Sequence, residues 1–404
     1  AAALLALLAA AGGAEGRGLR RSGDRALLLS DLWSAKATAA QGPDGAGPPE
    51  IIKNRGGQFH KDKMVFFVEA LLKDLPDHVW DELRRCPVAA ISVFDDAHTP
   101  ESHQAVVEEA WNVTAPVVWI VLNGEDMSGQ TTWEQIQAHM HPQDHAVILG
   151  NMFTERIEAR FEERFSSLWV PGASIFFMHR EMYTPMDLYD RSRTRFARER
   201  KGTVAYQSQS CSQRRDELFD HLYAGLVRSG HMGASALSKC DGIQAPLRAD
   251  GSGAYLPEED GGCRTENRWD QTVCRYEEFL FTEVLEHKTG YNRIGYLSEK
   301  LVDGFLAGTV PIYAGFQHVA QVFNPEAFIA ANISTPEGME STVRQVLRLL
   351  ENRTEYERVR RIEPLVSDAM MRKLFSWHPA VWPTHTDELR MVIVKEVLKH
   401  CARL

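Results

Sequence analysis

The sequence predicts an α/β fold made of two halves, and three observations lead to this prediction. The chain has 404 residues, too many for one typical core and enough for two domains and a tail. Apolar residues make up 44% and charged residues 25%, which is typical of a globular chain. Between polar breaks, short apolar runs alternate with segments of helical periodicity, a pattern that indicates parallel sheets covered by helices.

Three polar stretches divide the chain. Residues 36–57 are rich in Gly, Pro and Ala and indicate a stem, residues 190–203 are dense in charge, and residues 248–270 indicate a surface insertion. A cleft between two α/β halves is the default place for a ligand. We therefore expect an anchor remnant and stem at 1–57, an N-terminal α/β domain at 58–195 and a C-terminal α/β domain at 196–404.

The N-terminal stretch is apolar over its first 11 residues. It is too short to cross a bilayer, which takes about 20 residues, and it resembles the end of a signal peptide or signal anchor. We expect it to tether the protein to a membrane. Basic residues follow it and argue against a lumenal exit by the positive-inside rule: Arg17, Arg20, Arg21 and Arg25. The alternative is that this stretch is simply a low-complexity start.

Glycosylation motifs and cysteines favour a lumenal protein. Sequons occur at Asn112, Asn332 and Asn352. The six cysteines are compatible with disulfides, although the pairing stays open and free buried cysteines are the alternative. They are Cys86, Cys211, Cys240, Cys263, Cys274 and Cys401. A formal charge of −10 argues against a general nucleic-acid binder, so an anionic substrate would need a local basic site.

The elements alternate along both halves. Apolar, strand-like runs are expected at 89–94, 115–122, 144–150, 202–207 and 309–315. Helical periodicity is expected at 64–75, 154–165 and 214–230. The stretches at 277–285 and 295–308 continue the alternation in the second half.

Residues 295–315, "GYLSEKLVDGFLAGTVPIYAG", predict a helix that leads into a buried strand. Ser298 is a good N-cap, and Gly308 fits the left-handed residue that closes a helix. Asp303 and Gly304 are expected outside the apolar face, which consists of Leu301, Val302, Phe305 and Leu306. Pro311 limits the hydrogen bonding of the strand that follows.

Lys300 stands at the start of this helix, where the helix dipole disfavours a cation. The cost disappears if an anion binds at the same place, and the neighbouring Glu299 could accept hydrogen bonds from sugar hydroxyls. The pair would suit a sugar nucleotide. The alternative is that both side chains belong to a solvated first turn.

The same stretch, with "FNPEAFI" at 323–329, resembles the C-terminal domain of glycosyltransferase family 10, the α-1,3-fucosyltransferases. The resemblance covers about residues 200–335 and implies a GT-B fold, two Rossmann-like domains with an interdomain cleft and GDP-fucose held mainly by the second. Tyr296, Glu299 and Lys300 correspond to the family's donor-binding residues. The resemblance implies that the glutamate binds the ribose hydroxyls and that the lysine contacts the diphosphate.

Further site residues follow from the same resemblance. Arg215, with Arg214 as the alternative, corresponds to an arginine that grips the diphosphate through a bidentate fork. Glu283 corresponds to a donor-side glutamate, although Val284 replaces the asparagine that follows it in the family. Glu286 is the alternative to Glu283.

The general base is expected in the N-terminal half. An inverting transfer needs a carboxylate close to the acceptor hydroxyl. Glu125 follows the strand-like run "VVWIVLN", and we favour it because the end of a buried strand faces the cleft. Glu101 in "PESH" is the competitor, and a loop carboxylate without a role is the alternative for both.

The expected function is that of an inverting fucosyltransferase. The resemblance implies transfer of L-fucose from GDP-fucose to a glycan hydroxyl of a glycoprotein or glycolipid, α-1,3 to N-acetylglucosamine or glucose, in the Golgi membrane with the catalytic part lumenal. No strict DxD motif occurs, so we expect no metal and no further cofactor, with Arg215 and Lys300 supplying the charge. The alternatives are a GT-B transferase for another nucleotide sugar and a silent, lectin-like or scaffolding binder of the GDP-sugar.

Overall fold

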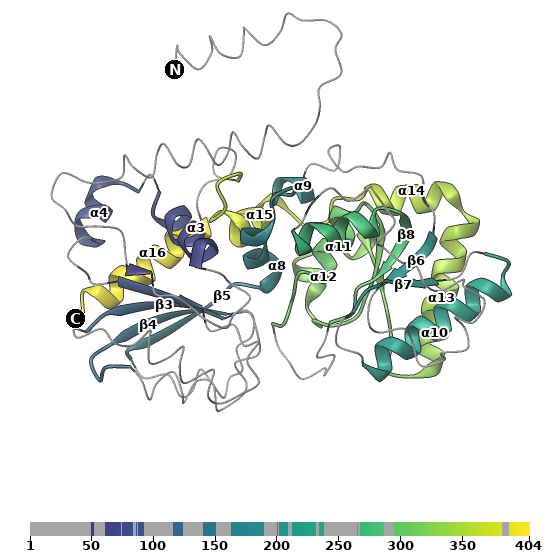
Figure 1. Cartoon of the computed structure of the whole chain (residues 1–404), viewed down its shortest axis with the longest axis horizontal. Helices are drawn as coiled ribbons and strands as arrows, with labels where there is room; N and C mark the ends of the chain where they lie inside the picture. The colour runs from purple at the N-terminus through teal and green to yellow at the C-terminus, as the bar shows by residue number, and fades with distance from the viewer. Residues whose placement is uncertain are drawn as a thin grey trace, which may run out of the picture. The chain divides into compact units, whose positions relative to one another are not determined.

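The computed structural model contains two five-stranded sheets, and all strands in both are parallel. Helices flank both sheets (Figure 1). The α/β class predicted from the alternating pattern is confirmed, with the paired parallel sheets expected of a GT-B chain. The structure describes residues 50–51, 61–73, 75–83, 86, 88–92, 116–123, 140–150, 163–189, 200, 202–208, 212–231, 234–237, 265, 267–286, 295–381 and 388–404.

The first sheet follows the chain order. Its strands are β1 (Glu50–Ile51), β2 (Val88–Ser92), β3 (Val118–Asn123), β4 (His145–Gly150) and β5 (Phe165–Trp169). Two helices precede β2, α3 (Lys61–Leu72) and α4 (Asp77–Leu83). The apolar runs predicted near β2, β3 and β4 are strands, and their continuous burial explains why they do not alternate with polar residues.

One prediction in this half is wrong at its end. The helix expected over 154–165 includes a turn at Glu163 and Arg164, and Phe165 begins β5, while residues 154–162 lie outside the described part. Strand β5 is an edge strand with the half-buried sequence FSSLW, so it lacks the apolar run of a central strand.

A buried segment leads from the first sheet toward the second. It contains α8 (Gly172–Ile175), the 3₁₀ turn η1 (Phe176–His179) and α9 (Met186–Tyr189). The backbone N–H of Ala173 donates to the carbonyl of Leu297 at 3.0 Å, and α8 and α9 both pack against α12 (Lys300–Leu306). This segment therefore supports the helix that begins at Lys300, a predicted donor-binding residue, with Glu299 as its N-cap.

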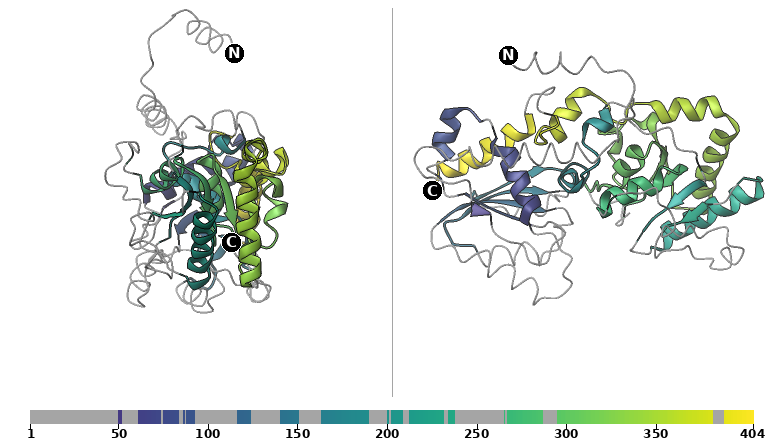
Figure 2. Two further views of the ribbon diagram at one scale, coloured as in Figure 1. Left: turned by 90° about the vertical axis from the view of Figure 1, so that its right-hand side faces the viewer. Right: turned by 45° about the horizontal axis from the view of Figure 1, so that its top comes forward.

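The second sheet has the order β10-β9-β8-β6-β7. Its strands are β6 (Gly202–Tyr206), β7 (Ala234–Ala236), β8 (Phe279–Glu283), β9 (Val310–Tyr313) and β10 (Ile329–Ala330). Helices α10 (Gln213–Arg228) and α13 (Pro336–Glu351) pack side by side, and α11 (Arg268–Tyr276) packs on α12 (Figure 2). The strands predicted at 202–207 and 309–315 and the helix predicted at 214–230 are confirmed within two residues.

The C-terminal part is helical and ends on the first sheet. It consists of the 3₁₀ turns η5 (Val319–Gln321) and η6 (Pro325–Ala327) and the helices α14 (Arg353–Arg361), α15 (Asp368–Phe375) and α16 (Glu388–Cys401). Helix α16 packs against α3, β3 and β4, where Ile393, Val394 and Val397 are buried (Figure 1). The expected domain limits of 58–195 and 196–404 stay predictions. These limits assign α16 to the second domain, whereas α16 packs on the first sheet.

A disulfide fixes this return of the chain. Cys86 and Cys401 are bonded across a sequence separation of 315 residues. Cys274 on α11 is disulfide-bonded as well. No helix in the described part of the chain is long and apolar enough to cross a membrane.

Two histidines join α16 to the first sheet. The Nδ1 atoms of His145 on β4 and His400 on α16 lie 2.9 Å apart, and Nε2 of His400 lies 3.0 Å from the hydroxyl of Ser166. One Nδ1 must donate and the other must accept, so the contact requires at least one neutral ring. Burial lowers the pKa of both imidazoles, that of His400 to about 4, and Arg403 lowers both further.

The histidine pair predicts a loss of stability in weak acid. The unfolded chain binds protons on these rings below about pH 6.5, while the folded protein resists protonation, so the free energy of unfolding falls as the pH falls. We expect the drop in Tm from neutral to weakly acidic pH to be smaller for His400→Gln than for wild type. His78→Gln, at an exposed position on α4, should retain the wild-type slope. Parallel slopes for His400→Gln and wild type, measured by thermal denaturation, would contradict this account.

Candidate functional site

The predicted donor-binding residues gather at one edge of the second sheet. Because its strands are parallel, β6, β8 and β9 end at the same edge, at Tyr206, Glu283 and Tyr313. Helix α10 begins shortly after β6, and the segment after β8 leads to the start of α12. In open α/β sheets this carboxyl edge is the usual place of a ligand.

The two arginines at the start of α10 differ in surroundings. Arg214 is exposed, and its Nη1 donates to the carbonyls of Ile333 and Ser334 at 3.1 and 3.3 Å. Arg215 is buried, with 2% of its surface exposed, and its positive charge acts on Glu283. Arg215 is therefore buried next to Glu283, as a residue of the donor site would be. Arg214 instead binds the segment that follows β10.

A tyrosine and an aspartate extend this cluster. The hydroxyl of Tyr206 donates to Oδ1 of Asp216 at 2.7 Å. Burial raises the pKa of Tyr206, and the charge of Glu283 and the bond to Asp216 raise it further. The hydroxyl of Tyr206 therefore keeps its proton and donates a hydrogen bond to Asp216.

Glu283 is the least satisfied group of the site. It ends β8 with 1% of its surface exposed, and among the described residues neither carboxyl oxygen has a hydrogen-bond partner. Burial raises the pKa of Glu283 well above its usual range, against the pull of Arg215, and Asp216 and Asp220 raise it further. A buried carboxyl without a partner costs free energy and often marks a functional position.

Glu286, the alternative to Glu283, has a different role. Its carboxylate accepts hydrogen bonds from the N–H of Ser298 at 2.9 Å, from the Ser298 hydroxyl at 2.5 Å and from the Tyr313 hydroxyl at 3.3 Å. A side chain added at Gly315 would meet Glu286, since an ideal Cβ there lies 2.3 Å from its Cγ. Glu286 thus ties the loop before α12 to the end of β9.

The predicted cap of α12 is displaced by one residue. The helix begins at Lys300 with Glu299 in the N-cap position, where no side-chain bond caps it. Ser298, the predicted cap, lies one position earlier. Its hydroxyl donates to Glu286, and its oxygen accepts from the N–H of Lys300 at 3.4 Å. With seven residues, α12 is also too short for a strong dipole, so attraction of an anion here depends on side-chain charge.

Glu299 and Lys300 lie together at the margin of the buried cluster. Nζ of Lys300 is 3.5 Å from Oε1 of Glu299 and 3.2 Å from the hydroxyl of Ser298. Their side chains are 15% and 25% exposed. Both groups can therefore contact a bound molecule, as the sugar-nucleotide hypothesis requires.

The expected polar face of α12 is wrong, because Asp303 and Gly304 are both buried. Asp303 pairs with Arg180, which makes its burial tolerable. Gly304 faces the sheet, where an added Cβ would lie 2.7 Å from Oγ1 of Thr282. Gly308 closes the helix with φ of 66°, as predicted.

Tyr276, like Tyr206 and Asp216, is a residue near the site that the sequence analysis did not single out. It ends α11, is 3% exposed, and its pKa is raised by burial and by the charges of Asp303, Glu283 and Glu299. It therefore lies between the α10 cluster and the start of α12. Its place at the head of "YEEFLFTEVL" was the available signal.

The remaining predicted residues are buried or outside the described part. Tyr296 is 5% exposed, just ahead of Ser298. Glu125 and Glu101, the two candidates for the base, both lie outside the described residues. Across the ranges that the structure describes, no group of three or more His, Cys, Asp or Glu residues is arranged to hold a metal ion.

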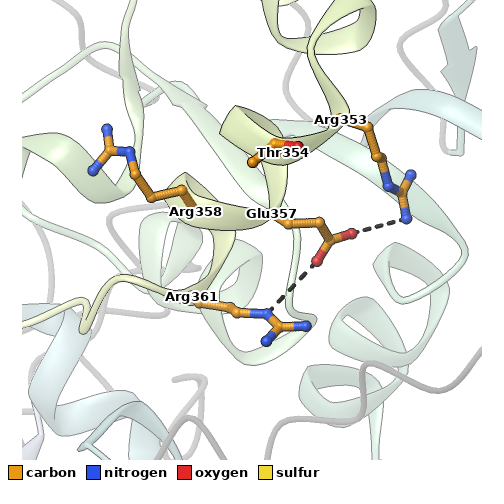
Figure 3. Close-up of a pocket in the computed structure, with 5 residues that line it drawn as sticks. All are labelled: Arg353, Thr354, Glu357, Arg358 and Arg361. Carbon is orange, nitrogen blue, oxygen red and sulfur yellow. Dashed lines mark ion pairs between the residues drawn. The ribbon is translucent and has the colours of Figure 1, made fainter.

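A shallow pocket of about 400 Å³ lies elsewhere, along α14. None of the predicted site residues lines it. Arg353 and Arg361 form ion pairs with Glu357 at 2.8 and 3.8 Å (Figure 3), and Thr354 and Arg358 complete the lining. Glu357 thus pairs with arginines of its own helix.

Comparison with known proteins gives one curated relative and several solved structures. No family model matches the chain. The α-(1,3)-fucosyltransferase FucT of Helicobacter pylori is 37% identical over 73 residues, which cover 17% of this chain and 15% of that enzyme. The resemblance to α-1,3-fucosyltransferases inferred from the motifs is confirmed by this match, which spans a small part of both chains.

The solved structures are distant. A crystal structure of an α1,3-fucosyltransferase is 11% identical, with coverage of 87% of this chain and 91% of that one and a TM-score of 0.45. The same kind of enzyme with GDP-fucose covers 77% and 90%, at 11% identity and a TM-score of 0.44. An α-glucosyltransferase in complex with UDP-glucose and DNA covers 76% and 80%, at 11% identity and a TM-score of 0.46.

The strained burial of Glu283 can be tested without any ligand. Its raised pKa means that the folded protein keeps a proton that the unfolded chain loses above about pH 4.3, so stability falls as the pH rises. Glu283→Gln has the same shape and does not titrate. We expect a higher Tm than wild type at weakly alkaline pH and a smaller decline toward it, measured by differential scanning calorimetry. Glu340→Gln, on the exposed side of α13, should match wild type, and a Glu283→Gln variant less stable than wild type would refute the argument.

Proposed function

We propose that this protein transfers L-fucose from GDP-fucose to a glycan hydroxyl with inversion at the anomeric carbon. The observation that carries the proposal is the gathering of Arg215, Glu283, Glu299 and Lys300 at one carboxyl edge of a parallel sheet. These are the positions that the α-1,3-fucosyltransferase resemblance assigns to the donor. The match to the Helicobacter pylori enzyme over 73 residues supports the same family.

The donor would bind through complementary charge. Arg215 and Lys300 are the cations of the site, and a guanidinium fork and an ammonium can neutralise the charge that builds on the leaving diphosphate. Glu299 is suited to accept hydrogen bonds from ribose hydroxyls, because its carboxylate is partly exposed. Two protein cations can perform this neutralisation without a metal ion, so we propose a metal-independent transfer.

The acceptor side needs a general base. The base removes the proton of the acceptor hydroxyl as the oxygen attacks the anomeric carbon, and the C–O bond to the diphosphate breaks on the opposite face. Glu125 comes two residues after Asn123, the last residue of β3, and we propose it for this role. Transfer to N-acetylglucosamine or glucose in α-1,3 linkage, on a glycoprotein or glycolipid, is the finer part of the proposal.

The cysteines support our proposal of an oxidising, lumenal location. Disulfides persist in secretory compartments and are rare in the cytosol, and Cys86, Cys401 and Cys274 are all disulfide-bonded. Asn352 is an exposed sequon residue whose Oδ1 caps α14, which leaves its Nδ2 for a glycan. We therefore propose a membrane-tethered Golgi protein with a lumenal catalytic part.

Two other functions use the same edge. A transferase for another nucleotide sugar would keep Arg215 and Lys300 and change the contacts to the base and sugar. A silent binder of the GDP-sugar would keep the whole donor site. Measuring binding and turnover of GDP-fucose, GDP-mannose and UDP-sugars separates these functions from the leading one.

Donor binding predicts a requirement for the diphosphate. GDP should raise the Tm of the purified protein and bind more tightly than GMP in calorimetry, because only the native state binds it. Lys300→Ala and Arg215→Ala should each lose roughly 2–4 kcal/mol of transition-state stabilisation in a fucosyl-transfer assay. Lys373→Ala on α15 and Arg214→Ala serve as matched controls with near wild-type rates.

Two results would contradict this donor site. Absence of any Tm shift at saturating GDP, in a protein shown to be folded, would remove the nucleotide from the proposal. Reversible loss of all activity with a chelator would show that a metal ion, rather than Arg215 and Lys300, neutralises the leaving group. Arg215→Lys keeps the buried charge. It is therefore the variant to measure if Arg215→Ala does not fold.

The base is tested by an isosteric exchange. Glu125→Gln keeps the shape of the side chain but cannot accept a proton, so transfer should fall by about 100-fold or more while GDP affinity stays unchanged. Glu101→Gln, made in parallel, should have a much smaller effect. Loss of transfer in Glu101→Gln with a tolerated Glu125→Gln would move the base to Glu101. A wild-type protein that binds GDP and transfers to no acceptor would favour the silent binder.

A further inference from the structure

Arg180 is a buried cation outside the predicted site that reaches the helix carrying Lys300. It follows η1, and its side chain is 1% exposed. Its Nη2 donates to Oδ1 of Asp303 on α12, and its Nη1 donates to the carbonyl of Trp269 at 3.1 Å. Oδ1 of Asp270 on α11 lies 3.8 Å from Nη1.

Asp270 holds the chain directly after this arginine. Its Oδ2 accepts the backbone N–H groups of Glu181 and Met182 at 2.8 and 3.0 Å. The segment that leads from the first sheet is thereby fixed to α11 at the residues that follow Arg180. The guanidinium consequently has little freedom to leave Asp303.

Asp303 lies one helical turn after Glu299, and its N–H donates to the Glu299 carbonyl at 2.9 Å. Burial raises the pKa of Asp303 to about 7; the charge of Glu299 raises it as well, while Arg180 and Lys300 lower it. The charged or titratable groups that act on Asp303 are Arg180 from the connecting segment, Glu299 and Lys300 from α12, and Tyr276 from α11, with Asp270 beyond Arg180.

The balance of these charges decides what Lys300 can do. Glu299 and Asp303 are two acids that both attract Lys300, and Arg180 is the cation that binds Asp303 directly. Without Arg180, an ionised Asp303 would have Lys300 as its remaining cation on α12. The ammonium would then be drawn back along the helix, and the negative charge of Asp303 would oppose any anion at the edge.

We propose that Arg180 is a positioning residue for the donor site, which neutralises Asp303 so that the charge of Lys300 remains directed at the diphosphate. The inference rests on the proposed function, because it assigns the ligand of Lys300 to GDP-fucose. It adds a residue outside the donor motif, on the segment that connects the two sheets. A purely structural Arg180 would only hold this segment against α11 and α12.

The pH profile of GDP binding separates the two roles. In Arg180→Met, Asp303 loses its counter-ion, so its carboxyl is protonated in weak acid and becomes charged only as the pH rises. GDP affinity should then approach that of wild type near about pH 6.5 and become weaker by about 10-fold or more near about pH 8.5. The double variant Arg180→Met/Asp303→Asn cannot develop this charge and should lose the added pH dependence.

The measurement is the ratio of GDP dissociation constants of Arg180→Met and of the double variant, by calorimetry across this pH range. The protonation of GDP itself is common to both proteins and cancels. A ratio that rises with pH supports the charge-balancing role. A ratio that is independent of pH, or wild-type affinity in Arg180→Met near about pH 8.5, overturns it.

Asp303→Asn alone covers the case in which Arg180→Met does not fold. It keeps the cation and removes the acid, so GDP should bind as tightly as to wild type or more tightly at alkaline pH. Weaker binding in folded Asp303→Asn would overturn the inference. If the wild-type protein binds no GDP, the proposed function is refuted. If the wild-type protein binds GDP but the ratio of dissociation constants does not change with pH, only the role of Arg180 is refuted.

Discussion

Carboxyl groups enclosed beside α11, α12 and the second sheet must each find a cation, hydrogen bonds or a proton. This constraint organises the candidate site. Asp270 and Asp303 face the buried guanidinium of Arg180, and Glu286 accepts three hydrogen bonds from the segments that it joins. Among the described residues Glu283 has no hydrogen-bond partner; the charge of Arg215 acts on it, yet burial holds its pKa well above the usual range. A buried acid that lacks its partner is expensive, so the exception is the place where a ligand would contribute most.

The architecture could be predicted because both sheets are parallel and buried on both faces. A continuous apolar run such as the one in β4 predicts a buried strand. A glycine directly after a helical pattern, such as Gly308, predicts the end of the helix. Strand β5 escaped prediction because an edge strand with two serines has no such run. The return of α16 to the first sheet escaped it because packing between distant segments leaves no local pattern.

The site divides in a similar way. The motif placed Glu299 and Lys300 at the start of a helix, and the structure finds them there. The sequence could not separate Arg214 from Arg215, or Glu283 from Glu286, because neighbouring residues of like charge differ only in what surrounds them in the fold. Burial of Asp303 was also hidden, since its counter-ion Arg180 lies 123 residues away in the sequence.

The bond between Cys86 and Cys401 gives the molecule a further property. It joins two points near the ends of the described chain, so the 315 residues of separation between them form a covalently closed ring. A single peptide-bond cleavage anywhere within that ring converts it to one open strand and releases no fragment. Tension applied through the N-terminal segment would likewise pass into the ring at Cys86, and the ring limits how far the enclosed sheets can be pulled apart. A chain closed in this way tolerates a nick that would divide an open chain.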